Sequence, residues 1–317
     1  MNATERSIVE QFPFWDRAPQ LPITADAGRR YVVVGCGTSF YLAQSVASAM
    51  NLAGIEAVAV PGSEWTHRPR AWVANETGVM VMVLSRSGES TESVQAAQRS
   101  RQAGLPVIGV TCEAGSSLAR NSDHVLFATT HPEEGIVMTA SASLMVLLGL
   151  RFIGQAVGPE TSLEARRVLQ ALDHGLPAVL ADRSHFVFLG SGPLYGIAQE
   201  GALKLQEMSL SYTQAYHPME YRHGPVSLVD DRTLVVMLTS DALRDEEAKL
   251  ARELQAKGAR VIGFGGPGDL SIEVTAPDAL RGLVCLPALQ LLGERVALRR
   301  GIDSTAPRHL TKVVLVA

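Results

Sequence analysis

Short apolar runs separated by segments of helix length dominate the first half of the chain. The runs that we predict as strands lie at residues 31–35, 56–60, 78–84, 106–110 and 124–128. Continuous apolar runs of this kind are typical of parallel strands that are buried on both faces of a sheet. Their alternation with helices predicts βαβ units and an α/β fold.

The second half of the chain repeats this pattern. Its apolar runs predict strands at residues 185–190, 233–238, 260–264, 282–286 and 312–316. The segment VVVGCGTSFYLAQSVA at 32–47 also aligns without a gap with VFLGSGPLYGIAQEGA at 187–202, with glycine, alanine and glutamine at matching places. Similarity over this length indicates a duplicated α/β domain.

The duplication divides the chain into domains. A polar helical segment follows the last apolar helix of the first half, and we expect the two halves to join there. The predicted parts are an N-terminal helical extension at 1–30, a first domain at 31–157, a helical linker at 158–184, and a second domain with a C-terminal tail at 185–317.

The composition is that of a globular protein without an extreme charge. The 317 residues are 46% hydrophobic and carry a formal net charge of −4, which argues against a basic nucleic-acid-binding surface. The three cysteines lie far apart without CxxC spacing, so they indicate neither a disulfide framework nor a zinc site. The chain opens without a signal-like apolar stretch, and no apolar run reaches the ~18 residues of a transmembrane helix. We therefore expect a cytoplasmic protein that binds neither nucleic acid nor membrane.

Two turns of the first half are rich in glycine and hydroxyl groups. GCGTS at 35–39 follows the first predicted strand, and SRSGEST at 85–91 follows the third. Ligands of parallel sheets collect beyond the carboxyl ends of the strands, where the N–H groups at helix N-termini favour an anion. Serine and threonine also act as ordinary N-caps in such loops. Two hydroxyl-rich loops at adjacent strand ends favour a phosphate or sugar site over simple capping.

A dinucleotide site is the natural alternative, but its pattern is incomplete. GCGTSF lacks the third glycine of G-x-G-x-x-G, and EAVAVPGS has no acidic residue after the second strand to bind a ribose hydroxyl. NAD binding is therefore not expected.

The second half carries ionisable residues instead of hydroxyl-rich loops. Glu200, Lys204 and Glu207 are spaced so that they share one face of a predicted helix, and His223 stands before a Gly-Pro turn. The simpler interpretation is an exposed Glu200–Lys204 ion pair worth ~0.3–0.5 kcal/mol, a solvated Glu207 and a structural histidine.

Taken together, these residues resemble the SIS family of phosphosugar isomerases, in particular proteins with two SIS domains. CGTS at 36–39 and SRSGES at 85–90 resemble that family's sugar-phosphate loops. EGALKLQE at 200–207, YRHGP at 221–225 and the tail at 301–316 resemble the isomerase half of glucosamine-6-phosphate synthases. The resemblance implies two tandem SIS domains, each a parallel sheet flanked by helices in a flavodoxin-like three-layer sandwich.

The resemblance also implies roles for the matching residues. Glu207 would move a proton between two sugar carbons, and His223 would open the sugar ring. Lys204 would keep Glu207 ionised or contact the substrate, and Lys312 matches a lysine that forms a Schiff base in the synthases. The residues expected to bind the sugar phosphate are Cys36, Gly37, Thr38, Ser39, Ser85, Arg86, Ser87, Ser90 and Thr139.

The sequence departs from the synthases in ways that bear on its activity. We expect no glutaminase segment before the first strand, and Arg86 and Ser90 replace the usual glutamine and threonine. The implied enzyme is a stand-alone deaminase/isomerase that converts glucosamine or galactosamine 6-phosphate to a ketose 6-phosphate and ammonia. An aldose–ketose isomerase, a sugar-amine phosphate deglycase and a non-catalytic sugar-phosphate sensor are alternatives. A homodimer with sites near the subunit interface is expected, and neither a metal nor an organic cofactor is implied.

Overall fold

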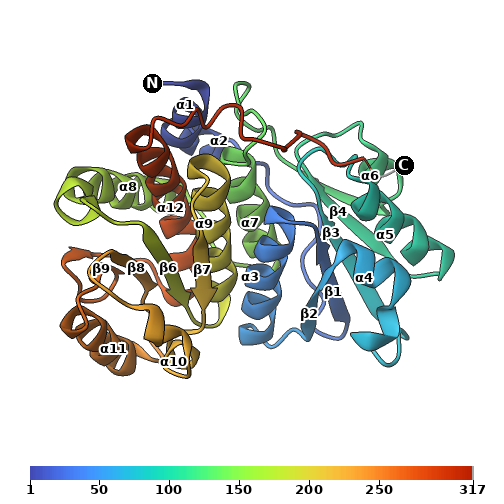
Figure 1. Cartoon of the computed structure of the whole chain (residues 1–317). Coiled ribbons are helices and arrows are strands. Elements are labelled where there is room, and N and C mark those ends of the chain that lie inside the picture. The colour runs from blue at the N-terminus through green and yellow to red at the C-terminus, as the bar shows by residue number, and fades with distance from the viewer. Residues whose placement is uncertain (316–317) are drawn as a thin grey trace.

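The computed structural model describes residues 1–315, which form two parallel α/β units side by side (Figure 1). The first sheet has the order β2-β1-β3-β4-β5, and all of its paired strands are parallel. Its strands are β1 (Arg30–Gly35), β2 (Ala57–Pro61), β3 (Val79–Leu84), β4 (Val107–Thr111) and β5 (His124–Phe127).

The second sheet repeats the topology of the first. Read from the matching edge, its order is β7-β6-β8-β9-β10, again with parallel pairing throughout. The strands are β6 (His185–Gly190), β7 (Thr213–Tyr216), β8 (Thr233–Leu238), β9 (Arg260–Phe264) and β10 (Leu270–Ile272). The predicted α/β fold with two parallel sheets flanked by helices is confirmed.

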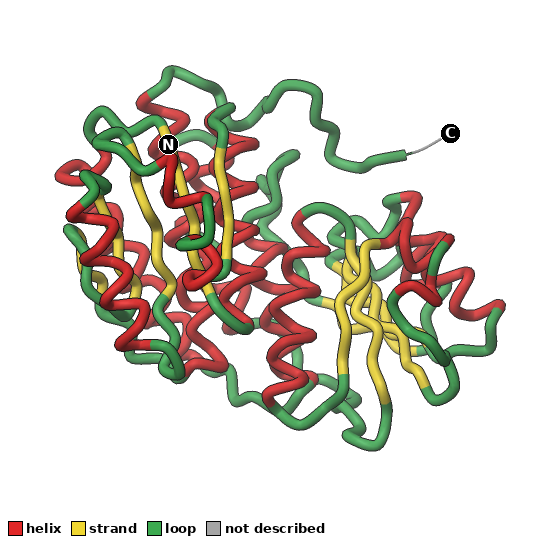
Figure 2. The backbone as a smooth tube through the Cα atoms, turned by 60° about the horizontal axis from the view of Figure 1, so that its bottom comes forward, coloured by secondary structure: helices red, strands yellow, loops and turns green. Residues whose placement is uncertain are grey.

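Helices cover both faces of each sheet and fill the space between the sheets (Figures 1 and 2). The central helices are α3 (Thr38–Leu52), α7 (Ala140–Phe152), α9 (Pro193–Ser209) and α12 (Asp278–Arg299). The remaining helices are α1 (Ala3–Val9), α2 (Phe12–Asp16), α4 (Gly62–His67), η1 (Pro69–Ala71), α5 (Thr91–Gln102), α6 (Ser117–Arg120), α8 (Pro159–Leu180), α10 (Pro218–Tyr221), η2 (Pro225–Leu228) and α11 (Arg244–Ala256). None of the helices within residues 1–315 is long and apolar enough to cross a bilayer.

The hydrophobic core joins the two halves. Alternate residues of a strand point to opposite faces of its sheet, so Val33 of β1 packs toward the central helices while Val32 and Val34 pack under α4 and α5. The central cluster continues from α3 and α7 through α9 and α12 to the inner face of the second sheet. The two sheets are therefore held in place by one shared layer of helices.

Helices α3 and α9 approach each other closely at a glycine. A Cβ atom at Gly196 would lie 2.3 Å from the backbone oxygen of Tyr41 and 2.7 Å from the backbone nitrogen of Ser45. Only glycine fits this crossing, because any side chain would overlap the backbone of the other helix. The crossing brings the N-terminus of α3 beside the middle of α9.

Two predicted strands are wrong. Residues 282–286 lie inside α12, a helix buried on nearly all sides, and an apolar run cannot by its pattern alone distinguish a buried strand from a buried helix. Residues 312–315 of the last predicted strand form an extended tail outside both sheets, and Val316 lies outside the described residues. The strands β7 and β10 were not predicted, because β7 is only half buried and β10 is three residues long.

Candidate functional site

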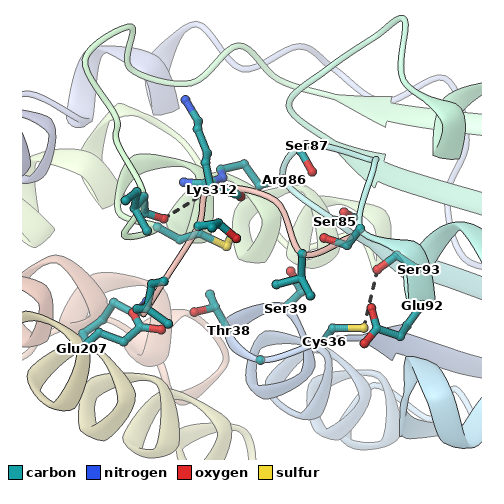
Figure 3. A pocket seen from close by; sticks show the side chains of 18 residues that line it. Cys36, Thr38, Ser39, Ser85, Arg86, Ser87, Glu92, Ser93, Glu207 and Lys312 are labelled. Atoms are coloured by element: carbon teal, nitrogen blue, oxygen red, sulfur yellow. Dashed lines mark hydrogen bonds and ion pairs between the residues drawn. The ribbon is translucent and has the colours of Figure 1, made fainter. Parts of the chain in front are cut away.

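A cavity of about 310 Å³ opens at the carboxyl ends of β1 and β3, where the strand order of the first sheet reverses (Figure 3). Open α/β sheets bind their ligands at this kind of position. The cavity is enclosed by the loops after β1 and β3, the first turn of α5, the C-terminal half of α9, the loop at 136–138 and the C-terminal tail. Its lining residues are Cys36, Gly37, Thr38, Ser39, Ser85, Arg86, Ser87, Ser90, Glu92, Ser93, Ile136, Met138, Lys204, Glu207, Leu310, Thr311, Lys312 and Val314.

One side of the cavity is built from hydroxyl groups. The backbone N–H of Gly88 donates to Ser85 Oγ at 3.1 Å, and that of Glu89 donates to Ser87 Oγ at 3.2 Å. Each serine oxygen thus accepts a backbone bond, and its own hydrogen can point to a ligand. Ser90 is the N-cap residue of α5, whose N-terminus favours a negative charge. Gly88 has φ = 63°, a conformation that glycine adopts readily and that turns the loop back toward α5.

Arg86 places a buried positive charge beside these hydroxyls. The residue is 7% exposed, and its guanidinium donates to the backbone oxygens of Gly135, Ile136 and Lys312 at 2.9–3.1 Å. Within residues 1–315, no carboxylate forms an ion pair with this group. A buried cation without an acidic partner is costly, and an anion in the cavity would supply the missing negative charge.

The opposite side of the cavity carries a buried lysine between two glutamates. Lys204 is 1% exposed; its ammonium donates to Glu207 Oε2 and lies 3.6 Å from Glu200 Oε1. Thr38 Oγ1 from the first half donates to Glu200 Oε1 at 3.3 Å. The exposed ion pair considered from the sequence is therefore wrong, since both Glu200 and Lys204 are buried.

Burial and charge shift the pKa values of this group. Burial raises the pKa of Glu200 to about 7, although the nearby Lys204 opposes the shift. Burial alone would lower the pKa of Lys204, but Glu200 and Glu207 outweigh it and raise this pKa above its ordinary value. Lys204 therefore keeps its proton, and Glu207 faces the cavity beside a permanent positive charge.

The tail brings Lys312 to the rim of the cavity but turns its ammonium away from Glu207. Lys312 Nζ donates to the backbone oxygen of Glu134 at 3.0 Å, and Figure 3 shows the side chain extended away from the side where Glu207 lies. The Glu134 carboxylate is itself buried and accepts bonds from the backbone and hydroxyl groups of Thr139 and Ser141 at the start of α7. Glu134 thus fixes the loop that holds Lys312.

Two residues expected in the site do not line the cavity of this chain. Thr139 is fully buried, and its hydroxyl bonds Ser7 at 2.7 Å and Glu134 at 3.2 Å, so it belongs to the N-terminus of α7 and not to the cavity wall. His223 is exposed in the turn between α10 and η2. The other expected residues meet at the cavity: Cys36, Gly37, Thr38, Ser39, Ser85, Arg86, Ser87, Ser90, Lys204, Glu207 and Lys312.

Several lining residues were missed by the sequence analysis. Glu92 and Ser93 lie in the first turn of α5, directly after the hydroxyl-rich loop, so their helical position could have indicated them. Ser93 Oγ lies 3.7 Å from the Cys36 thiol, and burial raises the pKa of that thiol. The rest come from the loop before α7 and from the tail, whose contact with the site depends on the tertiary fold: Ile136, Met138, Leu310, Thr311 and Val314.

Comparison with known proteins places this architecture in a family. The SIS domain model matches residues 25–150 and 179–273, one match in each half of the chain. The glutamine–fructose-6-phosphate aminotransferase (isomerizing) of Photorhabdus laumondii is 32% identical over 321 residues, which is 90% of this chain and 51% of that protein. The same enzyme of Methanothermobacter thermautotrophicus is 30% identical over 328 residues, 95% of this chain and 54% of that protein. The chain thus spans about half the length of these relatives.

Solved structures extend the likeness over the whole chain. The crystal structure of a glucosamine-6-phosphate deaminase from Thermotoga maritima has a TM-score of 0.87 at 29% identity, with 99% of this chain and 100% of that chain covered. A tagatose-6-phosphate ketose/aldose isomerase from Escherichia coli has a TM-score of 0.81 at 25% identity, with 99% and 96% covered. Since the family model matches most of the chain in two separate segments, the chain belongs to the SIS domain family and, as its sequence motifs predicted, to the phosphosugar isomerases with two SIS domains.

Proposed function

We propose that this protein is an amino-sugar phosphate deaminase/isomerase, which converts a 2-amino-2-deoxyaldose 6-phosphate to a ketose 6-phosphate and ammonia. The observation that carries the proposal is the division of one cavity into two chemical halves. Hydroxyl groups and the buried Arg86 guanidinium stand on one side, and the Lys204–Glu207 pair stands on the other. A phosphate ester with a reactive carbon at its far end matches this arrangement.

The phosphate is assigned to the loops of the first half. The hydroxyls of Ser39, Ser85, Ser87 and Ser90 offer neutral donors, and Arg86 offers the positive charge. Hydrogen bonds from neutral donors to a charged group contribute ~1.5–3 kcal/mol each, which makes the phosphate the main anchor of the substrate. Thr38 joins this wall to α9 through its bond to Glu200.

Glu207 is assigned as the base that moves the proton. In the open-chain substrate, removal of the C2 proton and return of a proton to C1 convert the aldehyde and amine into a 2-imine. Water then adds to the imine and releases ammonia and the ketose. Lys204 holds the Glu207 carboxylate in place through the hydrogen bond that its ammonium donates to Oε2.

His223 is assigned to ring opening in the cavity of a second copy of the chain. Its exposed position on a turn, outside the cavity of its own chain, supports this assignment. In the tail, Lys312 is assigned to contact the sugar oxygen at the open end of the cavity, after it leaves the Glu134 carbonyl.

A simple aldose–ketose isomerase is the second candidate, favoured by the likeness to the tagatose-6-phosphate ketose/aldose isomerase. Both reactions use the same proton transfer, but only the deaminase releases ammonia. The test is an ammonia-release assay with glucosamine 6-phosphate, galactosamine 6-phosphate and a fructosamine-type 6-phosphate, beside an isomerisation assay with tagatose 6-phosphate. Ammonia from glucosamine 6-phosphate or galactosamine 6-phosphate supports the proposal. Turnover of the fructosamine-type 6-phosphate alone would replace it with the deglycase, and turnover of tagatose 6-phosphate alone would replace it with the isomerase. Binding without turnover of any of them would indicate a sensor.

A further inference from the structure

The Arg86 side chain joins three segments that are far apart in the sequence. Its guanidinium bonds the carbonyls of Gly135 and Ile136 in the loop before α7, and also the carbonyl of Lys312 in the tail. Figure 3 shows Arg86 between the phosphate-binding loop and the tail segment that carries Lys312. One side chain therefore ties the tail to the wall that we assign to the phosphate.

Within residues 1–315, the tail has few other bonds to this wall. The backbone N–H of Thr91 donates to the Val314 oxygen at 3.2 Å, and Lys312 Nζ donates to Glu134. The tail side chains are themselves exposed, including Leu310, Val314 and Leu315. Little apolar burial holds the tail in place, so its position depends on these few polar bonds.

We propose that Arg86 is a positioning residue that holds the tail over the cavity and couples phosphate binding to the placement of Lys312. The guanidinium is buried without a carboxylate partner within residues 1–315, and a phosphate beside Ser85 and Ser87 supplies its counter-charge. A bound phosphate therefore favours the conformation in which Arg86 stays in place and keeps hold of the tail. The identity of the ligand rests on the proposed function. The attachment of the tail by Arg86 does not, because it follows from the three hydrogen bonds alone.

A glutamine at this position would not do the same. Its single amide group has two donor hydrogens and no charge, whereas the guanidinium spreads five donors over a planar fork and reaches all three carbonyls at once. A lysine would keep the charge but bond the carbonyls with one compact ammonium. Arg86→Gln should therefore free the tail, and Arg86→Lys should free it only in part.

The first experiment measures tail release without any ligand. Trypsin cleaves after Lys312, and mass spectrometry of the full chain follows the loss of residues 313–317. We expect about tenfold faster cleavage in Arg86→Gln and an intermediate rate in Arg86→Lys, because proteolysis follows the population of the open tail. Arg101→Gln, at an exposed arginine of α5, is the matched control and should cleave like the unaltered chain. Thermal melts identify any variant that unfolds globally. If Arg86→Gln does so, the cleavage rate of Arg86→Lys is compared with that of the control instead. Equal rates in the Arg86 variants and the control would overturn the proposal.

The second experiment tests the coupling with inorganic phosphate as the probe. Phosphate should slow cleavage after Lys312 in the unaltered chain and in Arg101→Gln. In Arg86→Gln it should still bind the serine hydroxyls, as calorimetry would report, but it should leave the cleavage rate unchanged. Equal protection in both chains would refute the coupling. If phosphate binds neither chain, the proposed function fails, while the ligand-free cleavage rates still decide whether Arg86 holds the tail.

The third experiment asks whether Arg86 acts through Lys312. Arg86→Gln and Lys312→Met should each lower kcat on the amino-sugar phosphate that turns over. If Arg86 acts by placing Lys312, the double variant should have the kcat of Lys312→Met alone, because residues that act through one another are not additive. Losses in kcat that multiply in the double variant would show that Arg86 does not act through Lys312, against the proposal.

Discussion

The two halves of the chain have the same topology but use the ends of their strands differently. In each half a glycine with φ = 54° begins the helix after the first strand, Gly37 before α3 and Gly192 before α9. In each half the strand order also reverses beside that loop. In the first half these loops border the cavity. In the second half a side chain of the protein itself lies between the corresponding loops.

The filling group is the Glu247 carboxylate. Glu247 is 0% exposed; Ser191 Oγ donates to its Oε1 at 2.9 Å, and the Ser240 backbone N–H donates to its Oε2 at 2.7 Å. Burial raises the pKa of Glu247, and these hydrogen bonds oppose the shift. The second half thus places a carboxyl group of its own at the ends of its strands.

The central helices α3 and α9 also differ, but here the second half carries the ionisable residues. In the alignment of the two halves, Glu200, Lys204 and Glu207 of α9 correspond to Ser45, Ala49 and Leu52 of α3. The first half therefore supplies the hydroxyl-rich loops and lacks the ionisable helix, whereas the second half supplies the ionisable helix. A duplicated fold can assemble one site from two halves when each copy keeps only one of the two functions.

The largest loss of activity is expected from a substitution in α9, the helix that carries Glu207. Glu207→Gln keeps the size of the side chain but removes the base, so kcat should fall by about 10²–10⁴ while the substrate still binds. Exchange of the C2 hydrogen with deuterated solvent, followed by NMR, reports the proton transfer directly and should be lost. Glu246→Gln, at an exposed acid of α11, is the control and should exchange normally. Normal exchange by a folded Glu207→Gln variant would place the base elsewhere.

The second effect is expected at the loops and has a control in the other half. Ser87→Ala with Ser90→Ala should weaken sugar-phosphate binding at least tenfold, since each lost bond to a charged group is worth ~1.5–3 kcal/mol. Ser191→Ala with Ser240→Ala changes the equivalent loops of the second half and should leave the affinity unchanged. Calorimetry with phosphorylated and unphosphorylated sugar measures both pairs. Equal losses in the two pairs would break the distinction between the halves.

The third effect is a loss of stability when the Glu247 carboxylate is removed from the second half. Glu247→Ala leaves the donors of half-buried Ser191 and buried Ser240 without their acceptor, which should lower the free energy of unfolding by about 1–3 kcal/mol. An oxyanion could then take the place of the carboxylate. In a chain that also carries Ser87→Ala and Ser90→Ala, phosphate should raise the melting temperature more with Glu247→Ala than with Glu247 intact. No added stabilisation would show that the second half does not form an anion site once emptied.

The last effect is a pH dependence of stability that originates at Glu200 in α9. The folded pKa of Glu200 is about 7, above its ordinary value of 4.5, so the folded state binds this proton more tightly than the unfolded state. The stability gained from it is complete below pH 4.5 and declines as the pH rises to 7, by at most ~1.4 kcal/mol per pH unit. Glu200→Gln should remove this slope, measured by urea unfolding at several pH values. Parallel pH profiles in the two chains would contradict the raised pKa.

Most of the fold followed from local patterns in the sequence. The strands of the first sheet carry apolar runs bounded by turns, and the internal repeat indicated that the second sheet would match the first. The apolar run at 282–286 was wrongly predicted as a strand, because α12 is surrounded by other helices and is apolar on nearly every side. The half-buried β7 has no apolar run, since its exposure removes the signal.

The site was predictable where its residues lie in contiguous motifs. The loops at 36–39 and 85–90 and the helix at 200–207 meet at the cavity as expected. The bonds of Arg86 to three carbonyls were not predictable, because any residue type supplies a backbone acceptor. The contacts of Glu247 with Ser191 and Ser240 were not predictable because they depend on the tertiary fold. Thr139 was expected to bind the sugar phosphate, but its hydroxyl instead bonds Ser7 and Glu134 inside the fold.

The missing side chain at Gly196 has a consequence for the size of the molecule that fits. The phosphate loops belong to the first half and Glu207 to the second, so the span between them depends on how closely α3 and α9 cross. A methyl group at this position would meet the Tyr41 backbone at 2.3 Å and push the two helices apart. Gly196 therefore limits the distance between the serine hydroxyls and Glu207, and with it the length of a ligand that can span the cavity, although Gly196 itself does not line the cavity.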